Sequence, residues 1–294
     1  MSKPDNQNPV YAPYPFAGQP ADVRNSKGND PVSGAFLQLE PEQKRFFNVN
    51  GYLLLRGFYD ETQMAEMRRR FRHLVAHTDG LPKAVLVGHM ESPEGYEPDA
   101  FNPNNLQGMM DQPLADDYWI DQSTEPRVVS AMVDLLGPDI DFHNGKIRNK
   151  PPGFTNDQGW HQDWPYELHT EPDLAAAITY LDPTDIDAGA TEVIPGGHLR
   201  GPLPTAEGTS ALVQEEVPSE RGIALKAETG DVAIVHVLAV HQAGNNRTKR
   251  SRNAIINEYK TAETVDRWNN RCAFAGLPLA RNGRLLMPRV SSTG

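Results

Sequence analysis

The chain has 294 residues, and its 28 basic and 39 acidic side chains give a formal net charge of −11. Such an acidic balance argues against nucleic acid as a partner. One cysteine, Cys272, leaves no internal disulfide framework and fits a reducing cytoplasm. No apolar run approaches membrane-spanning length, and no basic-then-apolar signal pattern opens the chain. We therefore expect a cytoplasmic protein with no membrane partner.

The N-terminal third predicts a tail followed by helices. Residues 1–35 are rich in Pro, Asn, Gly and Asp, which predicts an extended tail, either disordered or lying on the body or on a sister subunit. A homo-oligomer is thus left open. We expect residues 36–294 to form a single domain. Apolar spacing and capping residues predict helices over 41–48, 61–77 and 125–136, with a strand over 52–56.

Two segments interrupt this pattern and are expected to be insertions. Residues 79–120 are irregular and dense in Gly, Pro, Asn and Asp, and residues 200–222 are rich in Pro, Gly and Glu. A long irregular segment in a compact domain is often a lid over an active site. The alternative for the first insertion is a satellite core under a long loop.

From about residue 140 the pattern predicts strands. The run 142–150 alternates, so that Asn144, Lys146 and Arg148 share one face. Polar groups that face a barrel interior need a function, because their burial without partners is costly. The alternative is that this face is outer and solvated. Further strands are predicted over 174–181, 191–194, 230–235 and 252–259.

A metal-ligand pattern lies between these strands. His161 and Asp163 are two residues apart, and on an extended strand such residues point to the same face. With His241 they would complete the 2-His-1-carboxylate triad of non-haem iron proteins. Arg252 follows in the next strand, and a fixed guanidinium can bind a carboxylate through two hydrogen bonds.

The order HxD, His and Arg resembles the phytanoyl-CoA dioxygenase family of Fe(II)/2-oxoglutarate oxygenases. Residues 47–58, 149–153 and 188–198 are similar to other conserved stretches of that family. The resemblance implies a mainly β fold with flanking helices (α+β) and a double-stranded β-helix core, the jelly roll also found in cupins. It further implies Fe(II) held by His161, Asp163 and His241, with 2-oxoglutarate and O2 as cosubstrates.

The same resemblance suggests roles for further residues. It implies that Arg252 binds the far carboxylate of 2-oxoglutarate, and Arg148 and Lys146 are additional candidates for this cofactor-binding role. The family often has a hydroxyl two residues after the distal His, where this chain has Ala243. Thr179 is the candidate that replaces it.

Three residues are candidates for the substrate pocket. Asn144 shares the polar face of its predicted strand, and Trp164 and Tyr166 follow the HxD motif. The two aromatic residues are equally compatible with a place in the core.

These implications predict a dioxygenase that hydroxylates a small metabolite and releases succinate and CO2. Related halogenases replace the carboxylate ligand, so the presence of Asp163 favours oxygenation. The same centre would also serve desaturation, epimerisation or ring rearrangement in a biosynthetic pathway. A non-catalytic metal- or ligand-binding barrel is the remaining alternative. The sequence does not identify the primary substrate.

Overall fold

The computed structural model describes residues 23–24, 38–83, 85–89, 106–153, 158–167, 169–267 and 272–286. Most of the expected tail and the middle of the first insertion therefore lie outside the described residues. Of the tail, β1 (Val23–Arg24) is described and pairs in parallel with the first strand of the body. No helix in the described ranges is long and apolar enough to cross a membrane.

The N-terminal helices and strand form where their sequences predict them. α1 (Pro41–Asn50) ends at Gly51, whose φ of 79° is the left-handed conformation that glycine adopts without strain. β2 (Tyr52–Arg56) follows directly and is buried. Asp60 then caps α2 (Glu61–Ala76) by accepting a hydrogen bond from the Gln63 backbone N–H.

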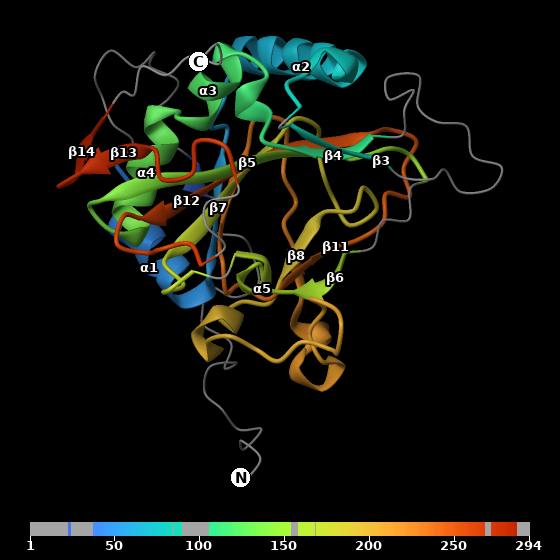
Figure 1. Cartoon of the computed structure of the whole chain (residues 1–294). Helices are drawn as coiled ribbons and strands as arrows, with labels where there is room; N and C mark the ends of the chain where they lie inside the picture. Colours follow the sequence, from blue (N-terminus) through green and yellow to red (C-terminus); the bar gives the residue numbers. More distant parts are fainter. Residues whose placement is uncertain are drawn as a thin grey trace, which may run out of the picture.

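The remaining helices are short. They are α3 (Asp117–Ser123), α4 (Pro126–Leu136), α5 (Trp164–Glu167) and the 3-10 turns Thr78–Gly80, Gln112–Leu114, Gly197–Arg200, Gln214–Glu216 and Ser219–Arg221. α4 packs against α1 and against the central strands of the large sheet. Figure 1 shows α2 and α3 together at one end of the molecule, and α1 and α4 beside the sheet.

A large sheet and a small sheet make up the β structure (Figure 1). The large sheet has ten strands, eight of which lie side by side in the order β1-β2-β10-β7-β12-β5-β13-β14. Apart from β1 and β2, these are β5 (Ile140–Lys150), β7 (Leu174–Tyr180), β10 (Val232–His236), β12 (Arg252–Thr261), β13 (Pro278–Arg281) and β14 (Arg284–Leu285). The small sheet has the order β6-β11-β8-β9: β6 (Gln158–His161), β11 (His241–Ala243), β8 (Thr191–Val193) and β9 (Ile223–Ala224). The mainly β fold with flanking helices is thus confirmed.

Alternation along β5 and β12 gives each strand two faces of different character. Tyr259 and Asn257 of β12 face the helices, where the Tyr259 hydroxyl donates to the Ser123 carbonyl and the Asn257 amide donates to Gln122. Arg252 and Ile256 lie on the opposite face, where they line a cavity between the sheets. The period of two therefore separates a packed core from a polar interior.

The first insertion is more regular than its composition predicts. β3 (Leu86–His89) and β4 (Leu106–Met110) form an antiparallel hairpin, and β4 extends the large sheet by pairing with β5. The residues after it form a 3-10 turn and α3. Gly108 stands directly opposite Arg148, and a Cβ at Gly108 would lie 2.6 Å from the Ile147 carbonyl oxygen. The expectation of an irregular segment over 79–120 was wrong for these residues, because a glycine here permits close pairing rather than a loop.

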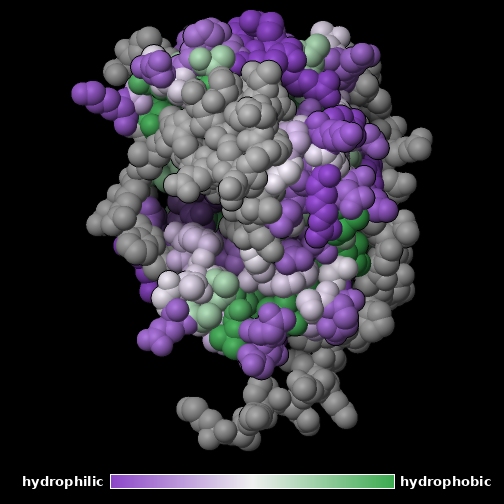
Figure 2. All heavy atoms as spheres, turned by 90° about the vertical axis from the view of Figure 1, so that its right-hand side faces the viewer, coloured by the Kyte–Doolittle hydropathy of each residue, from purple (hydrophilic) through white to green (hydrophobic). Residues whose placement is uncertain are grey.

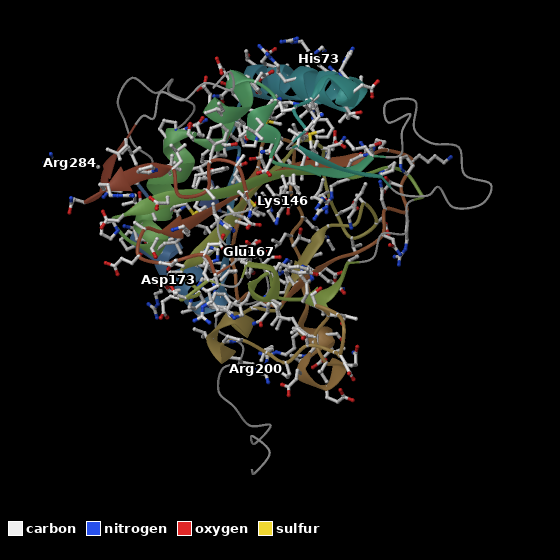
Figure 3. All side chains as sticks on the ribbon, in the orientation of Figure 1. His73, Lys146, Glu167, Asp173, Arg200 and Arg284 are labelled. Atoms are coloured by element: carbon white, nitrogen blue, oxygen red, sulfur yellow. The ribbon has the colours of Figure 1, made fainter. Side chains whose placement is uncertain are left out.

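Charged side chains lie at both the surface and the centre of the molecule. The coloured part of the face in Figure 2 is mostly hydrophilic, with smaller apolar areas. In Figure 3 the labelled His73, Arg200 and Arg284 lie at the periphery, whereas Lys146 and Glu167 lie at the centre of the molecule. Charged groups are therefore held inside the fold, between the two sheets.

Candidate active site

The three predicted metal ligands converge between β6 and β11. His161 ends β6, His241 begins β11, and the two are direct partners in the register of the small sheet. Asp163 lies in the turn after β6, where its backbone N–H donates to the Val237 carbonyl at 3.1 Å. One ligand-type atom from each of the three lies within 4.8 Å of the others. We call this group the inner cluster.

Backbone contacts orient both imidazole rings toward the carboxylate. His161 Nδ1 lies 2.7 Å from the Gly159 carbonyl oxygen, and His241 Nδ1 lies 2.9 Å from that of Ala239. A carbonyl can only accept, so each Nδ1 carries the proton and donates. The Nε2 atoms then present lone pairs, at 3.6 Å and 3.8 Å from the Asp163 carboxylate oxygens. Two imidazole nitrogens and one carboxylate are a donor set that fits a divalent iron ion.

Charge within the inner cluster is already arranged for a cation. Burial alone would raise the pKa of Asp163, but His241, His161 and Lys146 hold it well below its ordinary value. Burial, followed by the neighbouring His161, lowers the pKa of His241 to about 4. At neutral pH the cluster therefore contains a carboxylate and a neutral imidazole at position 241, the protonation states that a metal requires.

A cavity of about 290 Å³, the inner cavity, extends from the inner cluster to Arg252. Its apolar walls come from β7, β10 and β12 through Ala176, Ile178, Val235 and Ile256. Arg252 is 4% exposed and donates through one terminal nitrogen to the Gly189 carbonyl at 2.6 Å. Its Nε is buried with no hydrogen-bond partner, and burial lowers the pKa of the guanidinium. The residues fit a carboxylate ligand at this end of the inner cavity.

A different threonine from the predicted one reaches the inner cavity. Thr179 lies on β7 opposite Val232 and Ile255, on the core side of the sheet, because β7 presents its even-numbered residues to the cavity. Thr191 of β8 lines the cavity instead and accepts a hydrogen bond from the Tyr180 hydroxyl at 3.4 Å. The structure therefore does not bring Thr179 to the site. Thr191 was not predicted, because alternation along the strand of Arg252 gives no information about the separate small sheet that carries Thr191.

Lys150 fixes the strand segment that carries Ala243. Its ammonium donates to the Ala243 carbonyl at 2.7 Å and also to the carbonyl of Gly244. Lys150 and Ala243 both line the inner cavity. The methyl group at position 243 offers no hydrogen bond, so hydroxyl contacts in this cavity come from Thr191.

A second cavity of about 520 Å³, the outer cavity, lies on the other side of the inner cluster. The two cavities share Lys146, Arg148 and Asp163 as lining residues. The rest of its lining is mixed in character and consists of Met110, His143, Asn144, Pro165, Tyr166, Glu167, Asp266 and Cys272. Asn144, Lys146 and Arg148 thus face the interior together, as the alternation of their strand predicts.

The polar wall of the outer cavity is held together by Glu258. Its carboxylate accepts from the Asn144 amide at 2.8 Å and forms an ion pair with Lys146. Burial and then Glu167 raise the pKa of Glu258 to about 7, against the opposite effect of Lys146. We did not predict Glu258, although alternation from Arg252 along β12 places it on the same face.

Arg148 differs from Lys146 in forming no ion pair with the described residues. It makes no hydrogen bond with any of them, and burial lowers the pKa of its guanidinium, against the opposite effect of the nearby Asp163 and Glu258 carboxylates. It lines both cavities, beside the inner cluster. A half-buried cation without an ion-pair partner in this position can bind an anionic group.

The two aromatic candidates have different surroundings. Trp164 packs against Leu174, Val237 and Leu238, in a small apolar cluster beneath the site, and it does not line either cavity. Tyr166 lines the outer cavity, with its ring centroid 6.2 Å from that of His161. Its hydroxyl contacts Ser210 of the second insertion. Of these two aromatic residues, only Tyr166 is therefore positioned to contact a ligand in the outer cavity.

Comparisons with known proteins identify the family of the chain. The model of the phytanoyl-CoA dioxygenase (PhyH) family matches residues 47–254. A probable alpha-ketoglutarate-dependent hypophosphite dioxygenase from Stutzerimonas stutzeri is 25% identical, over 76% of this chain and 79% of its own. A probable phytanoyl-CoA dioxygenase from Caenorhabditis elegans is 27% identical, over 75% of each chain.

Solved structures show the same fold at lower identity. The alpha ketoglutarate dependent carbocyclase SnoK superposes with a TM-score of 0.66 at 18% identity, over 86% of this chain and 95% of its own. EctD from S. alaskensis gives a TM-score of 0.63 at 15% identity, over 88% and 85%. The jelly-roll core is thereby confirmed. The chain belongs to the phytanoyl-CoA dioxygenase family, and it is an Fe(II)- and 2-oxoglutarate-dependent oxygenase.

Proposed function

We propose that this oxygenase hydroxylates a small polar metabolite, which binds in the outer cavity while 2-oxoglutarate binds in the inner cavity. The observation that carries the proposal is the shared wall: Lys146, Arg148 and Asp163 line both cavities beside the inner cluster. Two ligands on opposite sides of this wall would meet at one metal. Residues 36–294 would act as a single domain, with 79–120 and 200–222 as insertions around the site.

We assign the metal to His161, Asp163 and His241. The bound iron would supply an oxidation coupled to conversion of 2-oxoglutarate and O2 to succinate and CO2. The protein's part is to keep both Nε2 lone pairs and the Asp163 carboxylate aimed at one point, through the backbone contacts of each Nδ1. Asp163 as third ligand supports oxygenation over halogenation.

We assign the far carboxylate of 2-oxoglutarate to Arg252. Its unpartnered Nε supports this role, since a carboxylate can accept from two guanidinium N–H groups at once. Arg252 is itself buried, and a contact shielded from water in this way is stronger than one at the surface. Thr191 would add one hydroxyl contact, in the role that we expected of Thr179.

Substrate recognition belongs to the outer cavity. Asn144 and Tyr166 would offer hydrogen bonds, and Arg148 would bind an anionic group next to the metal. Lys146 would act mainly through Glu258, because the two already form an ion pair. The single cysteine and acid-rich composition support a cytoplasmic enzyme that acts on a small molecule and not on nucleic acid.

The test is a panel of small polar metabolites incubated with the Fe(II)-loaded protein, 2-oxoglutarate and O2. We expect succinate release to rise with the true substrate, and the substrate-derived product to gain one oxygen atom by mass spectrometry. The His241→Ala variant is the inactive control. A product that has lost two hydrogens, or an isomer of unchanged mass, would replace hydroxylation by desaturation or by epimerisation and rearrangement.

A further inference from the structure

A second group of metal-ligand side chains lies beside the outer cavity. His143 comes from β5, Glu167 ends α5, and His169 forms an isolated β-bridge with Asp266. One ligand-type atom from each lies within 4.8 Å of the others. Among the described residues only this group and the inner cluster have that property. We call it the outer cluster, and it repeats the composition of two imidazoles and one carboxylate.

Both histidines are buried with unused ring nitrogens. His143 is 3% exposed and His169 is 1% exposed, and their rings meet edge to face at 4.5 Å between centroids. His143 Nε2 contacts the Glu167 carboxylate. Among the described residues, Nδ1 of His143 has no hydrogen-bond partner, and the nitrogens of His169 have none of good geometry, although the Glu167 backbone lies close enough to raise the pKa of His169 against the effect of burial. Burial of an unsatisfied polar group is costly, so two such rings side by side point to a ligand.

The charges around the outer cluster favour a cation. Burial lowers the pKa of His143, and it lowers that of His169 to about 4, so both rings are neutral at pH 7. Burial also raises the pKa of Glu167, against the opposite effects of Lys146 and of a hydrogen bond with Glu258, whereas Asp163 and Asp266 add to the rise. The nearby lysines already pair with other carboxylates: Lys146 with Glu258, and Lys260 with Asp141 at 3.6 Å. A divalent ion would compensate the carboxylate and satisfy the imidazoles together.

We propose that His143, Glu167 and His169 form a second metal site, which binds a divalent transition-metal ion such as Zn(II). Two imidazoles and one carboxylate are a ligand set of zinc sites that keep an open position. His143 and Glu167 line the outer cavity, so that position faces the space where the substrate would bind. The ion therefore acts as an additional contact for an oxygen or nitrogen atom of the substrate.

The experiment isolates the second site from the first. Full-length protein carrying His161→Ala and His241→Ala is freed of metal with a chelator, and Zn(II) is then titrated in competition with a chromophoric chelator. We expect one ion per chain, independently of whether the inner cluster binds iron. Adding His143→Ala and His169→Ala should weaken this binding by more than about 100-fold, since loss of second-shell partners alone costs about 10–100-fold.

A matched control addresses adventitious binding. His73 and His77 stack at 4.3 Å between centroids on the exposed surface of α2 and its end, where they are another pair of imidazoles. His73→Ala with His77→Ala should leave the remaining ion in place. Loss of the ion in this control, or no ion in the variant that retains the outer cluster, would overturn the proposal.

A milder change guards against misfolding of the double variant. Glu167→Gln keeps the shape of the side chain and removes its charge, and it should weaken Zn(II) binding at least tenfold while circular dichroism and the thermal midpoint in chelator stay unchanged. Co(II) in the same isolated site should give the visible absorption of a low-coordinate nitrogen and oxygen environment. Unaltered affinity in a folded Glu167→Gln protein would contradict the assignment.

Discussion

The inner and outer cavities differ in size and in how their charged groups are partnered. The inner cavity combines apolar side chains of β7, β10 and β12 with polar ones, and it has the buried Arg252 at one end and the inner cluster at the other. The outer cavity is larger, and its charged groups are partly compensated by one another, as Lys146 is by Glu258. A cosubstrate common to a whole family needs few, fixed contacts, whereas an individual substrate needs many. On the proposed function, the residues that select the substrate are therefore those of the outer cavity.

Removal of an inner ligand should produce the largest effect, because it disables both cavities at once. We expect His241→Ala to abolish turnover and to weaken Fe(II) binding by more than about 100-fold. Gln242→Ala is the matched control, since the Gln242 side chain bonds to Glu192. Chelator competition for Fe(II) and succinate release are the measurements. Full activity in His241→Ala would remove the assignment of the metal.

Arg252→Ala should affect the inner cavity alone. Loss of one member of a buried charge pair costs about 2–5 kcal/mol, or roughly 30- to several-thousand-fold in 2-oxoglutarate affinity. Fe(II) affinity should stay nearly unchanged, and Arg252→Lys should recover part of the loss. Titration of the anaerobic Fe(II) protein, followed by its charge-transfer absorption, measures the constant. An unchanged constant in Arg252→Ala would move the carboxylate contact to another cation.

Arg148→Gln should affect ligand binding in both cavities, because Arg148 lines both. We expect less than about a tenfold change in 2-oxoglutarate affinity, since the inner cavity keeps Arg252 and its enclosed contact. The coupling of 2-oxoglutarate turnover to substrate oxidation should decrease more, so that more succinate is formed per molecule of product. The ratio of succinate to product, measured with the substrate found in the panel, tests this. A loss of 2-oxoglutarate binding as large as that of Arg252→Ala would assign Arg148 to the cosubstrate.

The smallest expected effect distinguishes two threonines. Thr191→Val removes a hydroxyl from the inner cavity, which should cost about 0.5–1.5 kcal/mol of 2-oxoglutarate binding. Thr179→Val alters a side chain on the opposite face of β7 and should leave that affinity unchanged. The same titration compares both variants. If both variants weakened 2-oxoglutarate binding equally, the two hydroxyl groups would stabilise the fold without contacting the cosubstrate.

The sequence predicts much of this arrangement because local rules govern it. Strand alternation predicts the polar face of β5, and the order HxD, His and Arg brings together residues that lie close in space. Asp163, however, reaches the cluster from the turn after β6 and not from an extended strand. Thr179 failed because the face of a strand depends on its register in the sheet, which a single strand does not reveal. The outer cluster needs the bridge between His169 and Asp266, a long-range contact with no local signature.

The register that pairs His161 with His241 also has a consequence for synthesis of the protein. The second histidine leaves the ribosome long after the first, and β12 must follow before the large sheet can close around Arg252. If these residues hold the metal as proposed, the complete ligand set forms only after β11 has been synthesised. Before that, His161 and Asp163 alone would offer two ligands, too few to retain iron against competing ligands in the cell.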